Sequence, residues 1–337
     1  MTELLLGAYG AAMGGSARGI GRGRTGADGR FEYLGLVAEV ESPSWVTVTP
    51  RRVFAALEAD SAIAAWERAD DGSLHGLAMH DSGASASPCH LAVAARPSGG
   101  EALVAARYGD GVVAVHGVGA SAGDAVGPAE QELDAIGSGP WPAQASPHAH
   151  HVLVLDDGRI ATADLGADRV HLHRWRGARL ERVASVALPA GTAPRDLLPL
   201  SGGNLAVLGE WGLTVSLLRP TQETFEFAGS ASLPGERGLS QAAALALSAD
   251  GRFVIAGVRG ANRIAVTRWD GAELTAVGDI DCGGDWPRHL VRDRDFVHVA
   301  NQRSDSVTSF ALDSAGALTP LGEPVFAPSP TCLAVLS

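Results

Sequence analysis

Four segments of the chain carry polar side chains just where an apolar strand is expected to begin. They are Ser87–His90, Ser146–His150, Ala193–Asp196 and Trp286–His289, and each contains a proline followed by polar residues. Imidazole groups exchange protons near neutral pH. Guanidinium groups match the planar geometry of carboxylates and phosphates. These residue types would suit proton transfer and the binding of an anion.

A second set of polar residues follows other apolar runs, at Arg107–Gly109, Asp164–Gly166, Glu210–Gly212, Arg259–Gly260 and Asn301–Arg303. Residues at one phase of a repeat can gather in space although they lie far apart in the sequence. Arg195, Glu210 and Arg259 come from three repeats whose equivalent positions hold different residue types. A purely structural residue would repeat its type, so we interpret these three as functional. The alternative is that a Pro-x-His turn only staples neighbouring repeats, because all repeats have the same hydrogen-bonding needs.

His148, His150 and His151 also suggest a metal, because two histidines separated by one residue on a strand face the same side. No further Cys, His or Asp follows at a set spacing, and we predict neither a metal nor a cofactor. Cys89, Cys282 and Cys332 contain no CxxC pair. We expect them to be reduced thiols.

The elements that would position these residues are short strands in a repeating unit. Apolar runs with turn residues between them recur at intervals of roughly 40 to 60 residues, a spacing typical of β-propeller blades. The predicted second strands of six units are Val53–Leu57, Ala102–Ala106, Arg159–Ala163, Asn204–Leu208, Arg252–Gly257 and Phe296–Ala300.

Apolar runs remain at both ends of the chain, at Leu4–Tyr9 and Cys332–Leu336. Combined, they complete a seventh unit and remove exposed sheet edges. We therefore predict an all-β fold, a seven-bladed β-propeller whose ring is closed by pairing of the N- and C-terminal strands. We expect one domain over residues 1–337, with Gly117–Ala129 as an insertion between blades.

Composition narrows the function classes. The formal net charge is −12, which argues against a broad nucleic-acid-binding face. No apolar run approaches the 18 or so residues that span a bilayer, and the N-terminus lacks the pattern of a signal peptide. We expect a cytoplasmic protein that binds a small molecule and neither nucleic acid nor membrane. The oligomeric state stays open.

Several segments together resemble a known family. They read SPCHLAV (87–93), GSGPWPAQASPHAHHVLVLDDGR (137–159), ADLGADRV (163–170), LSADGRF (247–253), GGDWPRHL (283–290) and VANQRSDSV (299–307), with PSPTCLAVL (328–336) at the end. The chain resembles the bacterial seven-bladed propeller lactonases. That family includes 6-phosphogluconolactonases and is related to 3-carboxymuconate lactonising enzymes.

The resemblance implies a catalytic group of His148, Arg195, Glu210 and Arg259. It also makes His150, Asp164, Arg288 and His289 candidates for substrate binding. One departure is Asp196, which stands where the family usually has a histidine. Others are Arg107, Gly209 and Val258, which stand where blade corners commonly carry asparagine.

The implied activity is hydrolysis of a sugar-acid lactone, with 6-phosphogluconolactone as the expected substrate. No Ser-His-Asp elbow motif is present, so we expect direct attack by water. Glu210 or His148 would be the general base, with the other as acid or orienting group. Arg195 and Arg259 would bind the anionic group and the oxyanion.

Two other functions remain open. A cycloisomerase of carboxylated muconates would use the same residues in the lactonising direction. A propeller that serves only as an interaction platform would show a large exposed apolar patch and no convergent charged pocket.

Overall fold

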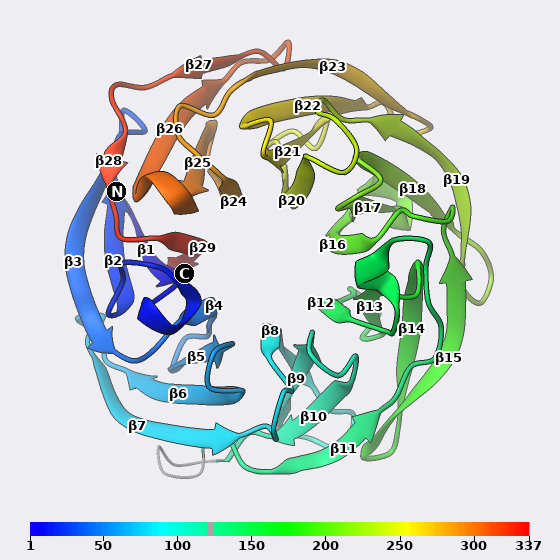
Figure 1. Ribbon diagram of the computed structural model, residues 1–337. Coiled ribbons are helices and arrows are strands. Elements are labelled where there is room, and N and C mark those ends of the chain that lie inside the picture. The colour runs from blue at the N-terminus through cyan, green and yellow to red at the C-terminus, as the bar shows by residue number, and fades with distance from the viewer. Residues whose placement is uncertain (120–124, 337) are drawn as a thin grey trace. The chain divides into compact units, whose positions relative to one another are not determined.

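Seven antiparallel sheets make up the computed structural model, which describes residues 1–119 and 125–336 (Figure 1). Contacts within the chain group into two compact units, residues 41–197 and residues 1–40 with 198–336. The chain passes between the units twice, at residues 40 and 41, which lie between two strands, and within one strand, β16 (Pro194–Pro199). The single-domain organisation stays a prediction.

The unit of residues 41–197 contains three complete sheets, each made of consecutive strands. The first comprises β4 (Pro43–Val48), β5 (Arg52–Leu57), β6 (Ala62–Arg68) and β7 (Leu74–Asp81). The second comprises β8 (Pro88–Ala95), β9 (Glu101–Arg107), β10 (Val113–Gly117) and β11 (Ala129–Leu133). The third comprises β12 (Ala149–Val154), β13 (Ile160–Asp164), β14 (Arg169–Arg176) and β15 (Arg179–Ala187).

The other unit repeats this pattern. After β16 come β17 (Leu205–Gly209), β18 (Thr214–Pro220) and β19 (Phe225–Ser232), and then β20 (Gln241–Leu247), β21 (Phe253–Arg259), β22 (Arg263–Trp269) and β23 (Leu274–Asp281). The next sheet has β24 (Pro287–Asp293), β25 (Phe296–Asn301), β26 (Ser306–Leu312) and β27 (Leu318–Pro320), with β28 (Val325–Phe326) also paired to β26. The described helices are single turns: η1 (Ala11–Met13), η3 (Pro142–Gln144), η4 (Ser201–Gly203) and η5 (Gln302–Ser304).

The last sheet joins the two ends of the chain, as predicted. β29 (Pro330–Leu336) pairs with β1 (Thr2–Ala8), and β2 (Gly19–Thr25) and β3 (Phe31–Glu39) follow (Figure 1). The sheet therefore consists of one C-terminal and three N-terminal strands. The pairing gives β1 a neighbour on both sides, so β1 has no open edge.

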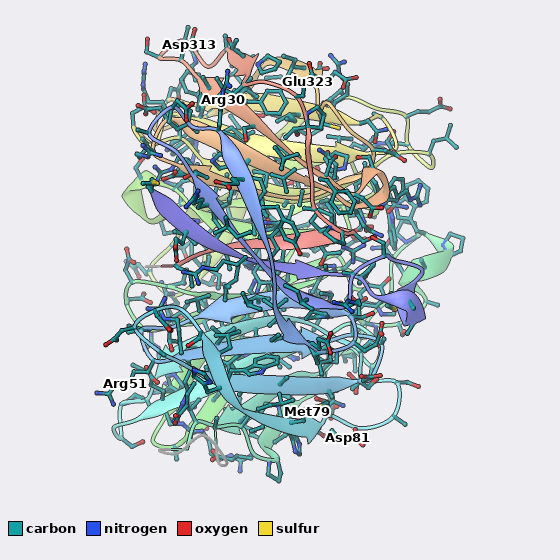
Figure 2. The ribbon with its side chains drawn as sticks, turned by 90° about the vertical axis from the view of Figure 1, so that its left-hand side faces the viewer. Arg30, Arg51, Met79, Asp81, Asp313 and Glu323 are labelled. Carbon is teal, nitrogen blue, oxygen red and sulfur yellow. The ribbon has the colours of Figure 1, made fainter. Side chains whose placement is uncertain are left out.

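Burial falls from the middle of each sheet to its last strand. Six of the seven residues of β9 and all seven of β21 are buried, whereas most residues of β7 and β23 are partly or fully exposed. On β7, the side chains of Met79 and Asp81 lie at the surface (Figure 2). The middle strands are apolar on both faces because each face packs on a neighbouring sheet.

The core fills the space between sheets that follow one another in the sequence. Phe54 and Ile63 pack with Leu91 and Leu103 in one cluster. Elsewhere, the sheet of β20–β23 packs on that of β24–β27 around Phe253, Val299 and Phe310. Small alanines in the second strands allow the sheets to approach closely.

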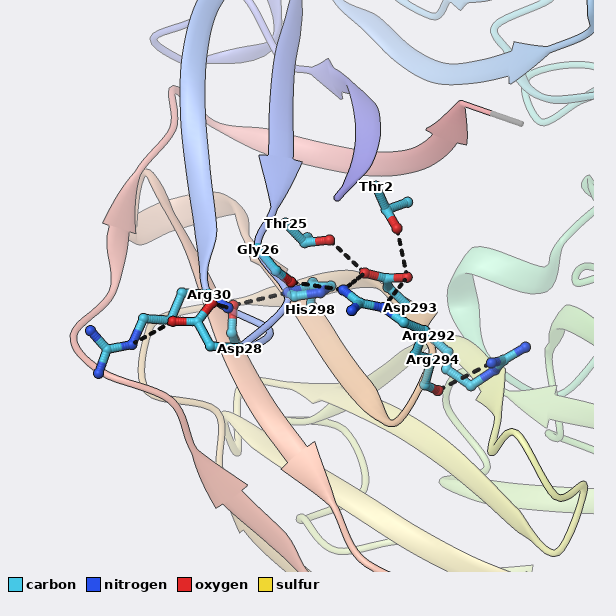
Figure 3. Close-up of polar contacts among 10 residues, drawn as sticks. Thr2, Thr25, Gly26, Asp28, Arg30, Arg292, Asp293, Arg294 and His298 are labelled. Atoms are coloured by element: carbon cyan, nitrogen blue, oxygen red, sulfur yellow. Dashed lines mark hydrogen bonds and ion pairs between the residues drawn. The ribbon is translucent and has the colours of Figure 1, made fainter.

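Asp293 links the N-terminal strands to the turn between β24 and β25. Its carboxylate accepts hydrogen bonds from Thr2 Oγ1 (2.9 Å) and Thr25 Oγ1 (2.5 Å) and pairs with Arg294 Nη2 (2.8 Å) (Figure 3). Arg294 Nη2 also donates to the carbonyl of Gly26 (2.8 Å). We call Asp293, Thr2, Thr25, Arg294 and Gly26 together the Asp293 clasp.

The predicted second strands agree with β5, β9, β13, β17, β21 and β25 to within one or two residues. One expectation was wrong. The segment Gly117–Ala129 does not connect two sheets, because β10 and β11 on either side of it pair within the same sheet. Residues 120–124 of that segment lie outside the described part of the chain.

Candidate active site

The first strand of each sheet begins with a repeated irregularity. In six of the sheets, one extra residue interrupts its pairing with the next strand. The extra residues are Ser44, Cys89, His150, Ala243, Arg288 and Thr331. Such β-bulges redirect a side chain and are frequent beside active sites. Arg195 follows Pro194 as Arg288 follows Pro287, so by sequence it occupies the same position.

A second repeated position lies across from the first, at the end of the second strand, one residue after the partner of the residue that precedes the bulge. It is held by Tyr9, Glu58, Tyr108, Leu165, Glu210, Arg259 and Gln302. Most of the chemistry predicted from the sequence comes from these two positions. Polar residues that recur at one phase of the repeat thus share a definite backbone feature.

Glu210 and Arg259 form a buried ion pair. The distance from Arg259 Nη2 to Glu210 Oε1 is 2.8 Å. Arg259 is 3% exposed and Glu210 is 5% exposed. The Arg259 guanidinium also lies 3.4 and 3.5 Å from the carbonyls of Gln241 and Ala242. Burial of two charges is costly unless they are paired and hydrogen-bonded. The pair therefore places a fixed carboxylate and a fixed cation side by side.

His148 is oriented by the neighbouring sheet. Its Nδ1 lies 2.6 Å from the carbonyl oxygen of Tyr108, and a carbonyl only accepts, so Nδ1 carries the proton. In the neutral ring, Nε2 then holds the lone pair. The ring of Tyr108 stacks on that of His148, with a centroid distance of 4.5 Å and an interplanar angle of 19°. His150 approaches the same tyrosine edge-on at 5.9 Å.

Asp164 fixes the backbone of His148. Its Oδ1 accepts the N–H groups of His148 (2.9 Å), Gly166 (3.1 Å) and Ala167 (3.1 Å). Asp164 is almost completely buried, and its Oδ2 lies 3.6 Å from His171 Nε2. The geometry gives Asp164 a positioning role, while direct contact with a substrate stays a prediction.

Arg195 is buried next to a pair of residues, His151 and Asp196, whose contact was not predicted from the sequence. Asp196 accepts the N–H of Leu197 (2.8 Å), and its Oδ1 lies 3.1 Å from His151 Nε2. Burial lowers the pKa of His151. The carboxylate of Asp196 acts in the opposite direction and Arg195 lowers the pKa further. The sequence signal for this pair was Asp196, which stands where a histidine was expected from the resemblance. Its partner, His151, could not be found from the sequence because the contact depends on the fold.

Arg288 and His289, both predicted to bind substrate, have different surroundings. Arg288 lies over the ring of Tyr9, with 4.5 Å from Cζ to the centroid, and donates to the hydroxyl of Tyr9 and to Gln302 Oε1. His289 Nδ1 accepts the N–H of Leu333 (3.1 Å) on β29. This is a staple between two sheets, and contact of His289 with substrate stays a prediction.

Of the four predicted catalytic residues, Glu210 and Arg259 are in direct contact. His148 and Arg195 each belong to the unit of residues 41–197. The assignment of all four to one pocket stays a prediction. Sequence reasoning missed Tyr9, Tyr108 and Trp286, whose aromatic rings contact Arg288, His148 and Arg259.

The described residues contain neither a cluster of metal ligands nor a membrane-spanning helix. No three side chains of His, Cys, Asp or Glu within residues 1–119 and 125–336 lie where they could share a metal ion. No helix in this part of the chain has the length and apolar character needed to cross a membrane.

Comparison with known proteins identifies the family. Residues 3–335 match the family model described as Lactonase, 7-bladed beta-propeller. A 6-phosphogluconolactonase of Bacillus subtilis (strain 168) is 29% identical over 262 residues, which cover 74% of this chain and 73% of the relative. An uncharacterized protein of Lactococcus lactis subsp. cremoris is 33% identical over 208 residues, 58% of this chain, and the match spans only 61% of that relative.

Among solved structures, the periplasmic gluconolactonase of Pseudomonas aeruginosa superposes with a TM-score of 0.88 at 27% identity. The superposition covers 100% of this chain and 99% of that protein. The seven-bladed β-propeller fold predicted from the repeat is thereby confirmed. The chain belongs to the seven-bladed β-propeller lactonase family.

Proposed function

We propose that the protein hydrolyses a sugar-acid lactone, with 6-phosphogluconolactone as the foremost substrate. The observation that carries the proposal is the buried Glu210–Arg259 pair. Family membership and the relatives named 6-phosphogluconolactonase and gluconolactonase support the reaction class. Such an activity belongs to carbohydrate metabolism, in the pentose phosphate pathway, and the cytoplasmic location stays a prediction.

The reaction begins with attack of water on the lactone carbonyl carbon. A general base takes one proton from that water as the new C–O bond forms. The free lone pair on His148 Nε2, which follows from the hydrogen bond at Nδ1, supports His148 as this base. Glu210 then holds Arg259 in place and is the alternative base.

Negative charge develops on the carbonyl oxygen as water adds. A guanidinium that is already oriented stabilises this oxyanion without reorganisation, and Arg259 is held by Glu210 and two backbone carbonyls. Collapse of the intermediate breaks the ring C–O bond. The proton removed from water returns to the leaving alkoxide, which gives the open hydroxy acid. Arg195 would bind an anionic group of the substrate.

The test is hydrolysis of freshly prepared 6-phosphogluconolactone, corrected for its spontaneous hydrolysis. We expect His148→Ala and Glu210→Gln each to lower kcat by about 10²- to 10⁴-fold. His75→Ala and Glu226→Gln are matched controls, because both side chains are exposed on outer strands. If both site variants remain within about twofold of wild type, the assignment is wrong.

Glu210→Gln removes one partner of a buried ion pair, so its folding must be checked by circular dichroism and thermal unfolding. His148 is only partly buried and provides the second variant should Glu210→Gln fold poorly. Carboxylated muconates assayed in parallel by absorbance would reveal the cycloisomerase instead.

A further inference from the structure

Trp286 has a backbone conformation that a bulky residue rarely adopts. Its φ is 67°, in the left-handed region. In four other sheets, the residue before the first strand is also left-handed, and it is small in each: Ser42, Ser87, Ala193 and Ser329. The left-handed region costs a non-glycine residue about 1–2 kcal/mol, and strained positions cluster at functional sites.

Hydrogen bonds on both sides hold Trp286 in this conformation. Its N–H donates to Asn262 Oδ1 (3.0 Å), and its carbonyl accepts the N–H of Gln302 (3.1 Å). The next residue, Pro287, starts β24. The surrounding structure therefore fixes the indole at this place instead of letting it relax.

Two guanidinium groups flank the indole of Trp286. Arg303 Cζ lies 3.5 Å from the ring centroid and Arg259 Cζ lies 5.4 Å from it. Trp286 thus connects Arg303 with the Glu210–Arg259 pair. The indole N–H makes no hydrogen bond to any residue that the structure describes, and the ring is only partly buried.

Arg303 keeps its charge and its donors available. It is exposed, and within the described residues its side chain makes neither an ion pair nor a hydrogen bond. A guanidinium that stacks on an aromatic ring presents its N–H groups at the edge, where they match a carboxylate or phosphate. The indole thereby orients Arg303 without neutralising it.

Arg288 belongs to the same corner of the sheet. The backbone of Asp285 and Trp286 accepts hydrogen bonds from Arg303 and Gln302, and Arg288 Nη1 donates to Gln302 Oε1 (3.3 Å). These hydrogen bonds join the turn that carries Arg303 to the β-bulge that carries Arg288. Because the protein has a net charge of −12, an anionic ligand needs such a local concentration of cations.

We propose that Arg303, stacked on Trp286, and Arg288 form a recognition site for an anionic group at carbon 6 of the substrate, a carboxylate or a phosphate monoester. This site is separate from the lactone carbonyl, which belongs to the Glu210–Arg259 pair. The inference rests on the proposed function, which it deepens by making a sugar-acid lactone with an anionic group at carbon 6 the preferred substrate.

Binding is measured by calorimetry with three open-chain acids that differ only at carbon 6. These are gluconate, glucarate with a second carboxylate, and 6-phosphogluconate with a phosphate. We expect Arg303→Gln to weaken the binding of 6-phosphogluconate, glucarate or both by about tenfold relative to gluconate, as loss of one charged hydrogen bond predicts. Whichever acid is affected identifies the group. Arg268→Gln, an exposed arginine on β22, is the matched control.

Equal weakening for all three acids, or no change for any of them, overturns the proposal. A kinetic measurement gives a second readout, the ratio of kcat/KM for 6-phosphogluconolactone to that for gluconolactone. We expect Arg303→Gln to lower this ratio about tenfold through KM. If wild type hydrolyses neither lactone but still prefers the C6-charged acids, the proposed function fails and the recognition site stands.

Discussion

At the scale of single residues, the candidate site depends on how each reactive side chain is held. The hydrogen bond from His148 Nδ1 to the Tyr108 carbonyl selects one tautomer and leaves Nε2 as the basic atom. Without that carbonyl, neutral imidazole would sample both tautomers. With Nδ1 protonated, the neutral imidazole of His148 can accept a proton only at Nε2.

Asp164→Ala tests the positioning of His148. The change removes the acceptor for the N–H groups of His148, Gly166 and Ala167. We expect kcat to fall by about 10- to 100-fold with KM little changed, because small displacements of a catalytic group are costly. Steady-state kinetics on the lactone provide the measurement.

Asp164→Asn is the matched variant, since its amide oxygen can still accept the same N–H groups. We expect it to recover most of kcat. A rise in KM in both variants would instead show that Asp164 contacts the substrate, which was its predicted role. A fall in kcat of the same size in both variants would count against positioning by Oδ1.

At the scale of elements, the repeated bulge explains why polar residues recur at one phase of the sequence. Each bulge sets one extra residue at the start of a first strand, as His150 and Arg288 show. The residue after the bulge then returns to the regular pairing. In two sheets this residue is a histidine whose Nδ1 accepts an N–H from a neighbouring first strand: His90 from Val152 and His289 from Leu333.

His289→Ala removes one of these staples. We expect the free energy of unfolding to fall by about 1–2 kcal/mol, because the Leu333 N–H loses its acceptor. His289→Asn offers an acceptor near the position of Nδ1 and should recover part of this loss. Urea unfolding followed by tryptophan fluorescence provides the measurement.

The same two variants separate the staple from substrate binding. If His289 contacts the substrate through Nε2, both variants raise KM, because asparagine cannot replace that atom. If His289 only joins β24 to β29, KM stays at the wild-type value in both. Equal stability of wild type and His289→Ala would contradict the staple.

At the scale of the whole molecule, the Asp293 clasp ties residues from opposite ends of the chain. Thr2 and Asp293 are 291 positions apart, yet their side chains are hydrogen-bonded. Burial alone would raise the pKa of Asp293. Hydrogen bonds from Arg294, Thr25 and Thr2 outweigh burial and lower the pKa to about 2. The ionised form is thus favoured in the folded protein.

This shift predicts how the clasp depends on pH. A carboxyl group with a depressed folded-state pKa stabilises the protein above its unfolded pKa of 3.8, and the contribution disappears as the pH falls from 3.8 to about 2. We expect Asp293→Asn to lower the free energy of unfolding by about 1–3 kcal/mol at pH 7. The difference from wild type should narrow as the pH approaches 3.

Urea unfolding of both proteins at pH 7, 5 and 3 checks this prediction, with Glu226→Gln as an exposed control on β19. A difference that is constant over this range would contradict the role of the ionised carboxylate. Wild type has a second acid-sensitive group in His298, whose pKa is lowered by burial from 6.5 to about 4. Its contribution is present above pH 6.5 and is lost as the pH falls toward 4. Because the Asp293 carboxylate raises the pKa of His298, this loss is somewhat larger in Asp293→Asn than in wild type.

The sequence alone determined the repeat, the number of sheets and the residues worth testing. Alternation of apolar residues and turn signals is local, so β5, β9, β13, β17, β21 and β25 were found within one or two residues. The pairing of the two chain ends followed from the incomplete repeat. The insertion at Gly117–Ala129 was misplaced because composition does not say which strands a segment connects.

Only the tertiary structure decided which side chains touch. Three contacts join residues from different strands or sheets: Glu210 pairs with Arg259, Arg288 lies over the ring of Tyr9, and Arg303 stacks on Trp286. Spacing in the sequence cannot encode these contacts, because bulges and left-handed residues set the direction of each side chain. The position of Trp286 at φ 67° is such a feature, since hydrogen bonds with Asn262 and Gln302 hold it there.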